Sequence, residues 1–149
     1  MHSVDDQYDL ERFVVAQDPV FDRVVSELRA GRKQTHWMWF IFPQISGLGS
    51  SAMAQRYAIG SIEEAQAYLM HPVLGARLRE CTRIVNSIDG RRVEDIFGAP
   101  DDMKFHSSMT LFSIAAPDAA EFSEALAKYF GYPDAGTFDR LQEIAARGQ

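Results

Sequence analysis

Apolar residues recur at helical spacing along most of the chain. The clearest stripe steps by four, three, four and three positions and is followed by Asp89-Gly90; it consists of Leu74, Leu78, Cys81, Val85 and Ile88. Shorter stripes with the same spacing precede and follow it: Leu10, Phe13 and Val14; Phe21, Val24, Val25 and Leu28; Ile62, Ala65 and Leu69; Phe105, Met109, Phe112 and Ala116; Phe122, Leu126, Tyr129 and Phe130; and Phe138, Leu141 and Ala145. Each stripe predicts a helix with one buried face.

Several residues predict where these helices begin and end. Ser61-Ile62-Glu63-Glu64 is a capping box, and Gly31 is a stop signal just beyond the helix that contains Leu28. Asp101 or Asp102 can start the helix that follows Pro100, and we expect Asp118 and Thr137 to cap the two helices after it.

The segment Trp37–Phe42 is the longest apolar run and contains both tryptophans. Its length fits a buried strand or a short buried helix, and periodicity does not separate the two. Because no other segment alternates convincingly and could pair with it, we favour a short helix that ends near Pro43. The sequence therefore predicts a single all-α domain of about seven or eight helices over residues 1–149, with residues 1–8 as a flexible N-terminus.

Composition and charge narrow the class of protein. The chain has 149 residues, 46% of them hydrophobic, and a formal net charge of −6, which argues against broad binding to nucleic acid or to anionic membranes but leaves room for a local basic pocket. Cys81 is the single cysteine, so an internal disulfide is excluded. The polar, acidic opening Met1–Asp9 lacks the pattern of a signal peptide, and Trp37–Phe42 is too short to span a membrane. We expect a cytoplasmic protein.

Residues around the tryptophans are candidates for a site. His36 is the candidate for catalysis, because an imidazole titrates near neutral pH; the alternative is a histidine at the edge of the core. Trp37 and Trp39 would point about 160° apart on a helix, so one would face the core and the other could stack on a ligand. Gln44 ends this segment and could donate or accept a hydrogen bond in the same pocket.

A second group of candidates lies on the helix after Pro100. Lys104, Ser107 and Ser108 share one helix face and could bind a phosphate or carboxylate; the alternative is tight helix packing around small residues. Arg32 and Lys33 could add positive charge to the pocket. The turn 47–51 lacks the spacing of a nucleotide-binding loop, and the four histidines lack the spacing of metal ligands. We predict neither a cofactor nor a metal ion.

Seven segments together resemble a known family, the domain of unknown function 1810. They are Leu10–Phe13, His36–Gln44, Tyr57–Ile59, His71–Gly75, Ile96–Gly98, Pro100–Lys104 and Ser107–Phe112. The resemblance covers nearly the whole chain and implies a compact all-α domain without an assigned activity. Some relatives carry the label calpastatin, but calpastatin-type inhibitors are long, polar and disordered, whereas this composition is globular. A distant kinship with NADAR-type helical domains, which act on N-glycosidic bonds of ADP-ribosyl groups, would be an analogy of fold only.

Two hypotheses about function follow. In the first, the chain has a pocket for a small anionic ligand of nucleotide type, with hydrolytic or group-transfer chemistry as an option. In the second, it is a non-enzymatic adaptor that binds another protein, or a second copy, through an exposed apolar patch drawn from Phe21, Tyr129, Tyr132 or Phe138. The oligomeric state does not follow from the sequence.

Overall fold

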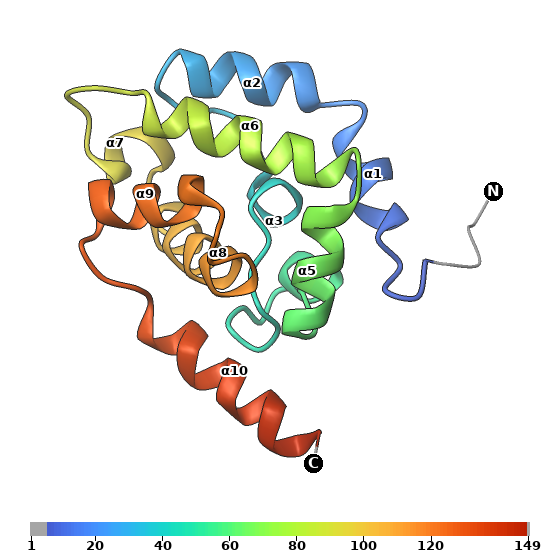
Figure 1. Ribbon diagram of the computed structural model, residues 1–149. Helices are drawn as coiled ribbons and strands as arrows, with labels where there is room; N and C mark the ends of the chain where they lie inside the picture. The colour runs from blue at the N-terminus through green and yellow to red at the C-terminus, as the bar shows by residue number, and fades with distance from the viewer. Residues whose placement is uncertain (1–5, 149) are drawn as a thin grey trace.

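The computed structural model describes residues 6–148, and they form a single all-α domain (Figure 1). Among these residues there are ten helices, seven of them with seven or more residues: α1 (Glu11–Gln17), α2 (Phe21–Arg29), α3 (Met38–Ile41), α4 (Ala52–Arg56), α5 (Ile62–Met70), α6 (Leu74–Asn86), α7 (Val93–Phe97), α8 (Asp101–Ala115), α9 (Ala120–Tyr129) and α10 (Ala135–Arg147). The predicted fold class is confirmed. Helix α3 corresponds to the apolar run Trp37–Phe42. The helices without a counterpart in that run or in the apolar stripes are α4 and α7, which are too short to show a period.

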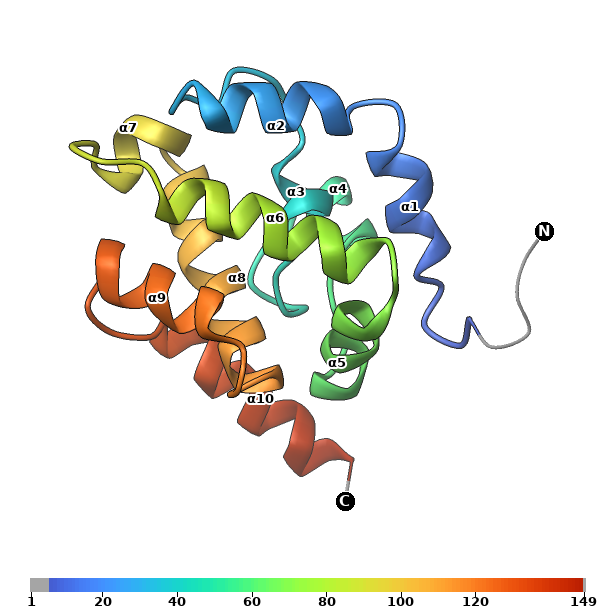
Figure 2. The same ribbon diagram turned by 45° about the horizontal axis from the view of Figure 1, so that its top comes forward.

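The long helix α8 organises the core. It packs against α5, α7, α9 and α10, while α6 packs against α2, α5 and α9. Eight of its fifteen residues are buried, on all sides of the helix. Figure 2 shows α6 crossing over the short helix α3, which lies in the middle of the molecule, while α10 extends away from the rest. The aromatic segment therefore lies at the centre of the fold.

The segment Trp37–Phe42 forms the short helix α3, as predicted, with Trp37 as its N-cap. Trp37, Met38 and Phe42 are almost completely buried, whereas Trp39 stays partly exposed. Immediately after the helix, Ile45 and Ile59 form an isolated parallel bridge. A single bridge does not make a sheet, so the choice of helix over strand holds.

Two of the predicted caps are wrong. Ala119, not Asp118, precedes α9, and no side chain caps that helix. Asp134 caps α10: its Oδ2 accepts hydrogen bonds from the backbone N and from Oγ1 of Thr137, so Thr137 lies in the first turn. The expected inward position of Phe138 is also wrong, because 47% of this residue is exposed.

The other helix starts agree better with the sequence. Asp101 is the first residue of α8. Ser61 caps α5 by accepting a hydrogen bond from the backbone N of Glu64, while the Glu64 carboxylate accepts one from the backbone N of Gly60 rather than of Ser61. A flexible N-terminus is predicted over residues 1–8, of which residues 1–5 lie outside the described residues. Tyr8 packs against the core.

Candidate functional site

The carboxylate of Glu27 on α2 holds the connection between α2 and α3 in place. Its Oε1 accepts hydrogen bonds from the backbone N of Gln34 (2.6 Å), the backbone N of Thr35 (3.0 Å) and the indole N of Trp37 (3.0 Å). Its Oε2 accepts one from the Thr35 hydroxyl (2.6 Å). Burial of Glu27 favours the neutral acid, but these hydrogen bonds outweigh it and lower the pKa of the carboxyl below its ordinary value. A buried, ionised carboxylate therefore fixes the loop that carries Lys33 and His36.

Two lysines from distant parts of the sequence share one carboxylate. Lys33 Nζ lies 2.8 Å from Asp101 Oδ2, and Lys104 Nζ lies 3.4 Å from Asp101 Oδ1. Each ammonium also lies 5.1 Å from the centre of an indole ring, Lys33 over Trp37 and Lys104 over Trp39. An ammonium within about 6 Å of an indole face is attracted by the ring. This cluster carries one net positive charge and joins the aromatic segment to the start of α8.

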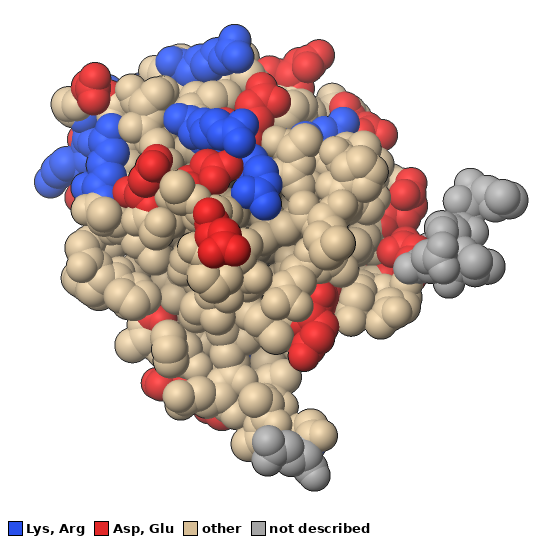
Figure 3. Space-filling view, viewed as in Figure 1, with Lys and Arg blue, Asp and Glu red and all other residues tan. Residues whose placement is uncertain are grey.

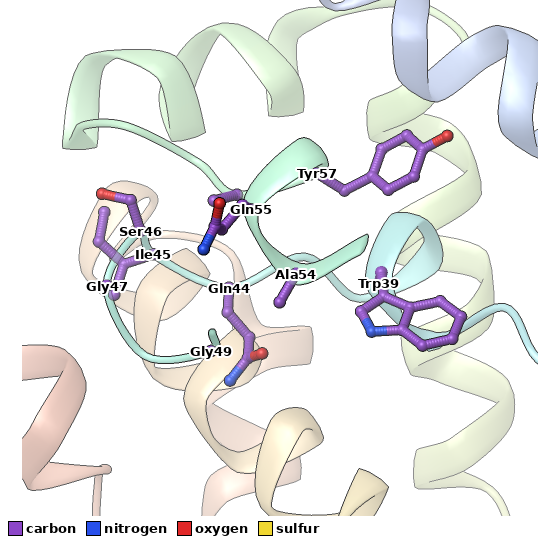
Figure 4. A pocket seen from close by; sticks show the side chains of 10 residues that line it. Trp39, Gln44, Ile45, Ser46, Gly47, Gly49, Ala54, Gln55 and Tyr57 are labelled. Atoms are coloured by element: carbon purple, nitrogen blue, oxygen red, sulfur yellow. The ribbon is translucent and has the colours of Figure 1, made fainter. Parts of the chain in front are cut away.

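A small cavity lies beside Trp39, between α3, the following loop and α4 (Figure 4). Its volume is about 160 Å³, and it is lined by Trp39, Gln44, Ile45, Ser46, Gly47, Gly49, Ala54, Gln55, Tyr57 and Ala58. Pockets for drug-sized ligands are typically about 300–1,000 Å³. This cavity is therefore large enough for one ring or one anionic group, not for a whole nucleotide.

The cavity wall formed by residues 44–49 is fixed by contacts on several sides. The Gln44 carbonyl accepts a hydrogen bond from Ile59 N, and Ser46 N donates one to the Ile59 carbonyl, each at 2.8 Å. Arg140 of α10 donates from Nε to the Ser46 carbonyl at 2.8 Å. Gly47 has a φ of +94°, and a Cβ there would collide with the Arg140 guanidinium. The glycine is thus required both for the turn and for the close approach of α10.

The two serines of α8 lie beneath this wall rather than in the cavity. Ser107 Oγ accepts a hydrogen bond from Gln44 Nε2 (2.7 Å) and donates to the Met103 carbonyl (3.0 Å). Ser108 is completely buried, and its Oγ has no hydrogen-bond partner among residues 6–148. Three residues were predicted to share a binding face. Lys104 is partly exposed, whereas Ser107 and Ser108 are buried. Ser107 acts by holding Gln44.

Arg32 and His36 lie on the loop that Glu27 orders, and both are exposed. Neither side chain makes a hydrogen bond or an ion pair within residues 6–148. Arg32 lines a separate surface hollow together with Lys33, Arg91 and the residues of α7. Contacts through Asp101 and α8 therefore connect Lys33, Trp37, Trp39, Gln44, Lys104 and Ser107. Within residues 6–148, no ion pair, hydrogen bond or ring contact links the side chain of Arg32 or His36 to this cluster.

Sequence reasoning missed two members of the site. Asp101 was interpreted as a helix start, and nothing in its local sequence shows that two lysines converge on it. Glu27 is not a candidate in the sequence analysis, but its spacing contains a signal. Val24, Glu27, Leu28 and Gly31 follow the i, i+3, i+4, i+7 pattern, which places a carboxylate in the buried stripe of α2.

No group of three or more His, Cys, Asp or Glu residues between positions 6 and 148 could hold a metal ion. Over the same range, no helix is both long and apolar enough to cross a membrane.

Comparison with known proteins places the chain in a family. Residues 7–141 match the family described as "Protein of unknown function (DUF1810)", and the chain belongs to this family. Its structure is similar to that of the conserved hypothetical protein Rv1873 from Mycobacterium tuberculosis: the sequences are 58% identical, the TM-score is 0.91, and the match covers 92% of this chain and 99% of the other. No curated protein matches the sequence significantly.

Proposed function

We propose that the cavity beside Trp39 binds a small molecule that carries a planar ring and an anionic group. One observation carries this proposal: a partly exposed indole lines a cavity while an ammonium group, Lys104, is held over the same indole. The indole provides a flat apolar surface for a ring, and the ammonium provides the charge that attracts an anion.

The polar groups around the cavity support recognition of such a ligand. Gln44 Nε2 is engaged by Ser107, and this contact fixes the orientation of the carboxamide, whose oxygen is then available to a ligand. The loop 46–49 adds backbone groups on the opposite side from Trp39, as Figure 4 shows. A preorganised set of this kind costs little ordering entropy on binding.

His36 is the residue proposed for catalysis. Its imidazole is exposed and uncommitted within residues 6–148, and it follows Lys33 by three positions on the loop that Glu27 orders. Such a group can transfer a proton to or from the part of a ligand that extends out of the cavity. The reaction class would be hydrolysis or group transfer.

A thermal-shift screen against nucleotides, ADP-ribose and sugar phosphates tests the binding proposal. A ligand at one hundred times its dissociation constant stabilises the fold by about 2.7 kcal/mol, which raises the Tm by about 5–10 °C. The variant Lys104→Met keeps the length of the side chain but removes its charge, and it should abolish most of the shift. Arg23→Ala removes a charge from the exposed face of α2 and serves as the control.

The same screen separates binding from chemistry. His36→Ala should leave the shift within about 1 °C of wild type but stop turnover of any ligand that the wild-type protein consumes. The binding proposal fails if no member of the screen shifts the Tm, or if Lys104→Met and wild type respond equally.

A second candidate function is protein binding, favoured by an apolar groove between α10, the end of α8 and the start of α5. This groove has a volume of about 650 Å³ and is lined by Phe138, Leu141, Ile144 and Ala145 of α10, and by Ile62 and Ile114. Figure 3 shows that the charged side chains on this face gather above, over α2 and α6, while the part over α10 is mostly uncharged. Phe21 lies on α2, at the opposite end of the molecule from α10 (Figure 1), so it cannot contribute to this groove. Light scattering and a pull-down assay test this candidate.

A further inference from the structure

A second hollow lies next to α7 and shares Lys33 with the Lys33–Asp101–Lys104 cluster. It is lined by Arg32, Lys33 and Arg91, by Glu94, Asp95, Ile96 and Phe97 of α7, and by Gly98. Its volume is about 620 Å³, nearly four times that of the cavity beside Trp39. Its lining is mostly polar. The function proposed above does not use this hollow.

The two carboxylates that line this hollow make ion pairs, whereas its two arginines make none within residues 6–148. Its two carboxylates, Glu94 and Asp95, both lie within ion-pair distance of Arg92, at 3.7 and 3.6 Å. Asp95 also accepts a hydrogen bond from the backbone N of Arg92. Arg92 itself is not among the residues that line the hollow. One arginine outside the hollow therefore offsets one of its two negative charges. Because three cations and two carboxylates line the hollow, the lining itself keeps one net positive charge.

The two arginines that line the hollow have no such partner. Arg32 is exposed, and its side chain makes no ion pair or hydrogen bond with residues 6–148. Arg91 donates from Nε to the Gly31 carbonyl at 2.9 Å, which orients its guanidinium without neutralising it. Asp95 is close enough to Arg91 for their charges to interact, so Arg32 is the guanidinium with the least compensation among the described residues. An unpaired guanidinium beside Arg91 and Lys33, in a concave polar surface, is suited to a phosphate group, whose oxygens match the arrangement of guanidinium donors.

A continuous series of contacts connects this hollow to the cavity beside Trp39. Lys33 lines the hollow and pairs with Asp101 Oδ2; Lys104 pairs with Oδ1 of the same carboxylate and lies over Trp39. Between the indole and the hollow, one carboxylate, Asp101, separates the two lysines, and two more, Glu94 and Asp95, lie in the hollow beside the arginines.

We propose that the hollow of Arg32, Lys33 and Arg91 is a second anion subsite, which binds a phosphate group of the same ligand whose ring occupies the cavity beside Trp39. The part of this inference that concerns a shared ligand rests on the proposed function. The ligand is then elongated: the ring contacts Trp39, a first phosphate lies near Lys104, and a second phosphate reaches Lys33 and Arg32.

Isothermal titration with AMP, ADP and inorganic pyrophosphate tests the subsite. Wild type should bind ADP at least tenfold more tightly than AMP, because the second phosphate gains the guanidinium contacts. Arg32→Ala should weaken ADP binding about five- to tenfold and leave AMP binding within twofold. Arg23→Ala, an equal loss of charge outside the hollow, should change neither affinity. Arg32 makes no side-chain bonds within the described residues, so its removal should leave the fold intact, and an unchanged circular dichroism melt checks this.

The outcomes separate the two proposals. If AMP binds and Lys104→Met weakens it, but Arg32→Ala leaves the ratio of ADP to AMP affinities unchanged, the second subsite is refuted and the proposed function stands. If neither nucleotide binds, but pyrophosphate binds to wild type and not to Arg32→Ala, the hollow is an anion site, and the shared ligand is refuted. The proposed function itself then fails if ADP-ribose and the sugar phosphates also leave the Tm unchanged. If pyrophosphate and ADP both fail to bind, or if Arg23→Ala weakens them as much as Arg32→Ala does, the subsite is refuted.

Discussion

Replacing Glu27 tests whether one buried carboxylate holds the loop between α2 and α3. Only 8% of Glu27 is exposed, and its Oε1 accepts three N–H groups, from Gln34, Thr35 and Trp37. In Glu27→Ala these donors lose their acceptor, and each donor left unpaired costs about 1–3 kcal/mol unless water reaches it. We expect a total loss of about 3–5 kcal/mol, which lowers the Tm by about 6–20 °C.

Glu27→Gln should cost much less. The amide oxygen can accept the three N–H groups, and the amide nitrogen would face the Thr35 hydroxyl, which can turn to accept a hydrogen bond. What is lost is the charge, and because hydrogen bonds to charged groups are about twice as strong as neutral ones, the expected loss is about 1–2 kcal/mol. Glu124→Gln, an exposed change of the same kind on α9, serves as the control.

Urea denaturation at a series of pH values is the assay, and the lowered pKa of Glu27 fixes the sign of the effect. A carboxyl whose pKa is lower in the folded state stabilises the fold fully above its ordinary value, 4.5, and loses this contribution as the pH falls through the folded value. The difference between wild type and Glu27→Gln should therefore be largest near pH 7 and shrink on acidification. A difference that grows in acid, or equal losses for the alanine and glutamine variants, would refute the reasoning.

Two further predictions concern packing and charge. Gly75→Ala should destabilise the protein by about 3 kcal/mol or more, because the added Cβ would collide with the Leu69 carbonyl, which is backbone and cannot move aside. Urea denaturation measures this loss, and a change within 1 kcal/mol would show that the start of α6 shifts freely. Asp101→Asn should strengthen binding of ADP several-fold, by about 1 kcal/mol, because it removes the carboxylate between Lys33 and Lys104. Unchanged or weaker binding in titration calorimetry would show that the carboxylate does not compete with the ligand.

The long helices could be predicted from the sequence because their apolar stripes are regular. The stripe from Leu74 to Ile88 matches α6, whose buried residues include Leu74, Leu78, Cys81 and Val85. The caps were harder, because Asp118 and Thr137 have cap-like side chains that the backbone does not use. At α10 the sequence did contain the answer: Asp134 stands three positions before Thr137, the spacing at which a cap accepts from the third helical residue.

The sequence predicts the residues of the site but not how they come together. Lys33, Trp37 and Trp39 are conspicuous because they lie in one apolar, cation-flanked segment. Their connection to Asp101 and Lys104 depends on how α8 lies against α3, and no local pattern encodes a contact between residues almost seventy positions apart. For Ser107 and Ser108 the sequence left two alternatives open, a binding face or tight packing around small residues, and the structure buries both serines. The sequence alone could not choose between them, because α8 is buried on all sides and helical phase does not reveal which face is open.

The attachment of α10 has a consequence for the stability of the small cavity. Thr137 is the one buried residue of this helix, so α10 should open locally at a lower free energy than the core helices. Arg140 hydrogen-bonds the Ser46 carbonyl and packs on Gly47, so each opening of α10 also releases one wall of the cavity. We therefore expect the amide hydrogens of residues 46–49 to exchange with solvent at the pace of the C-terminal helix rather than at that of the aromatic core beside them.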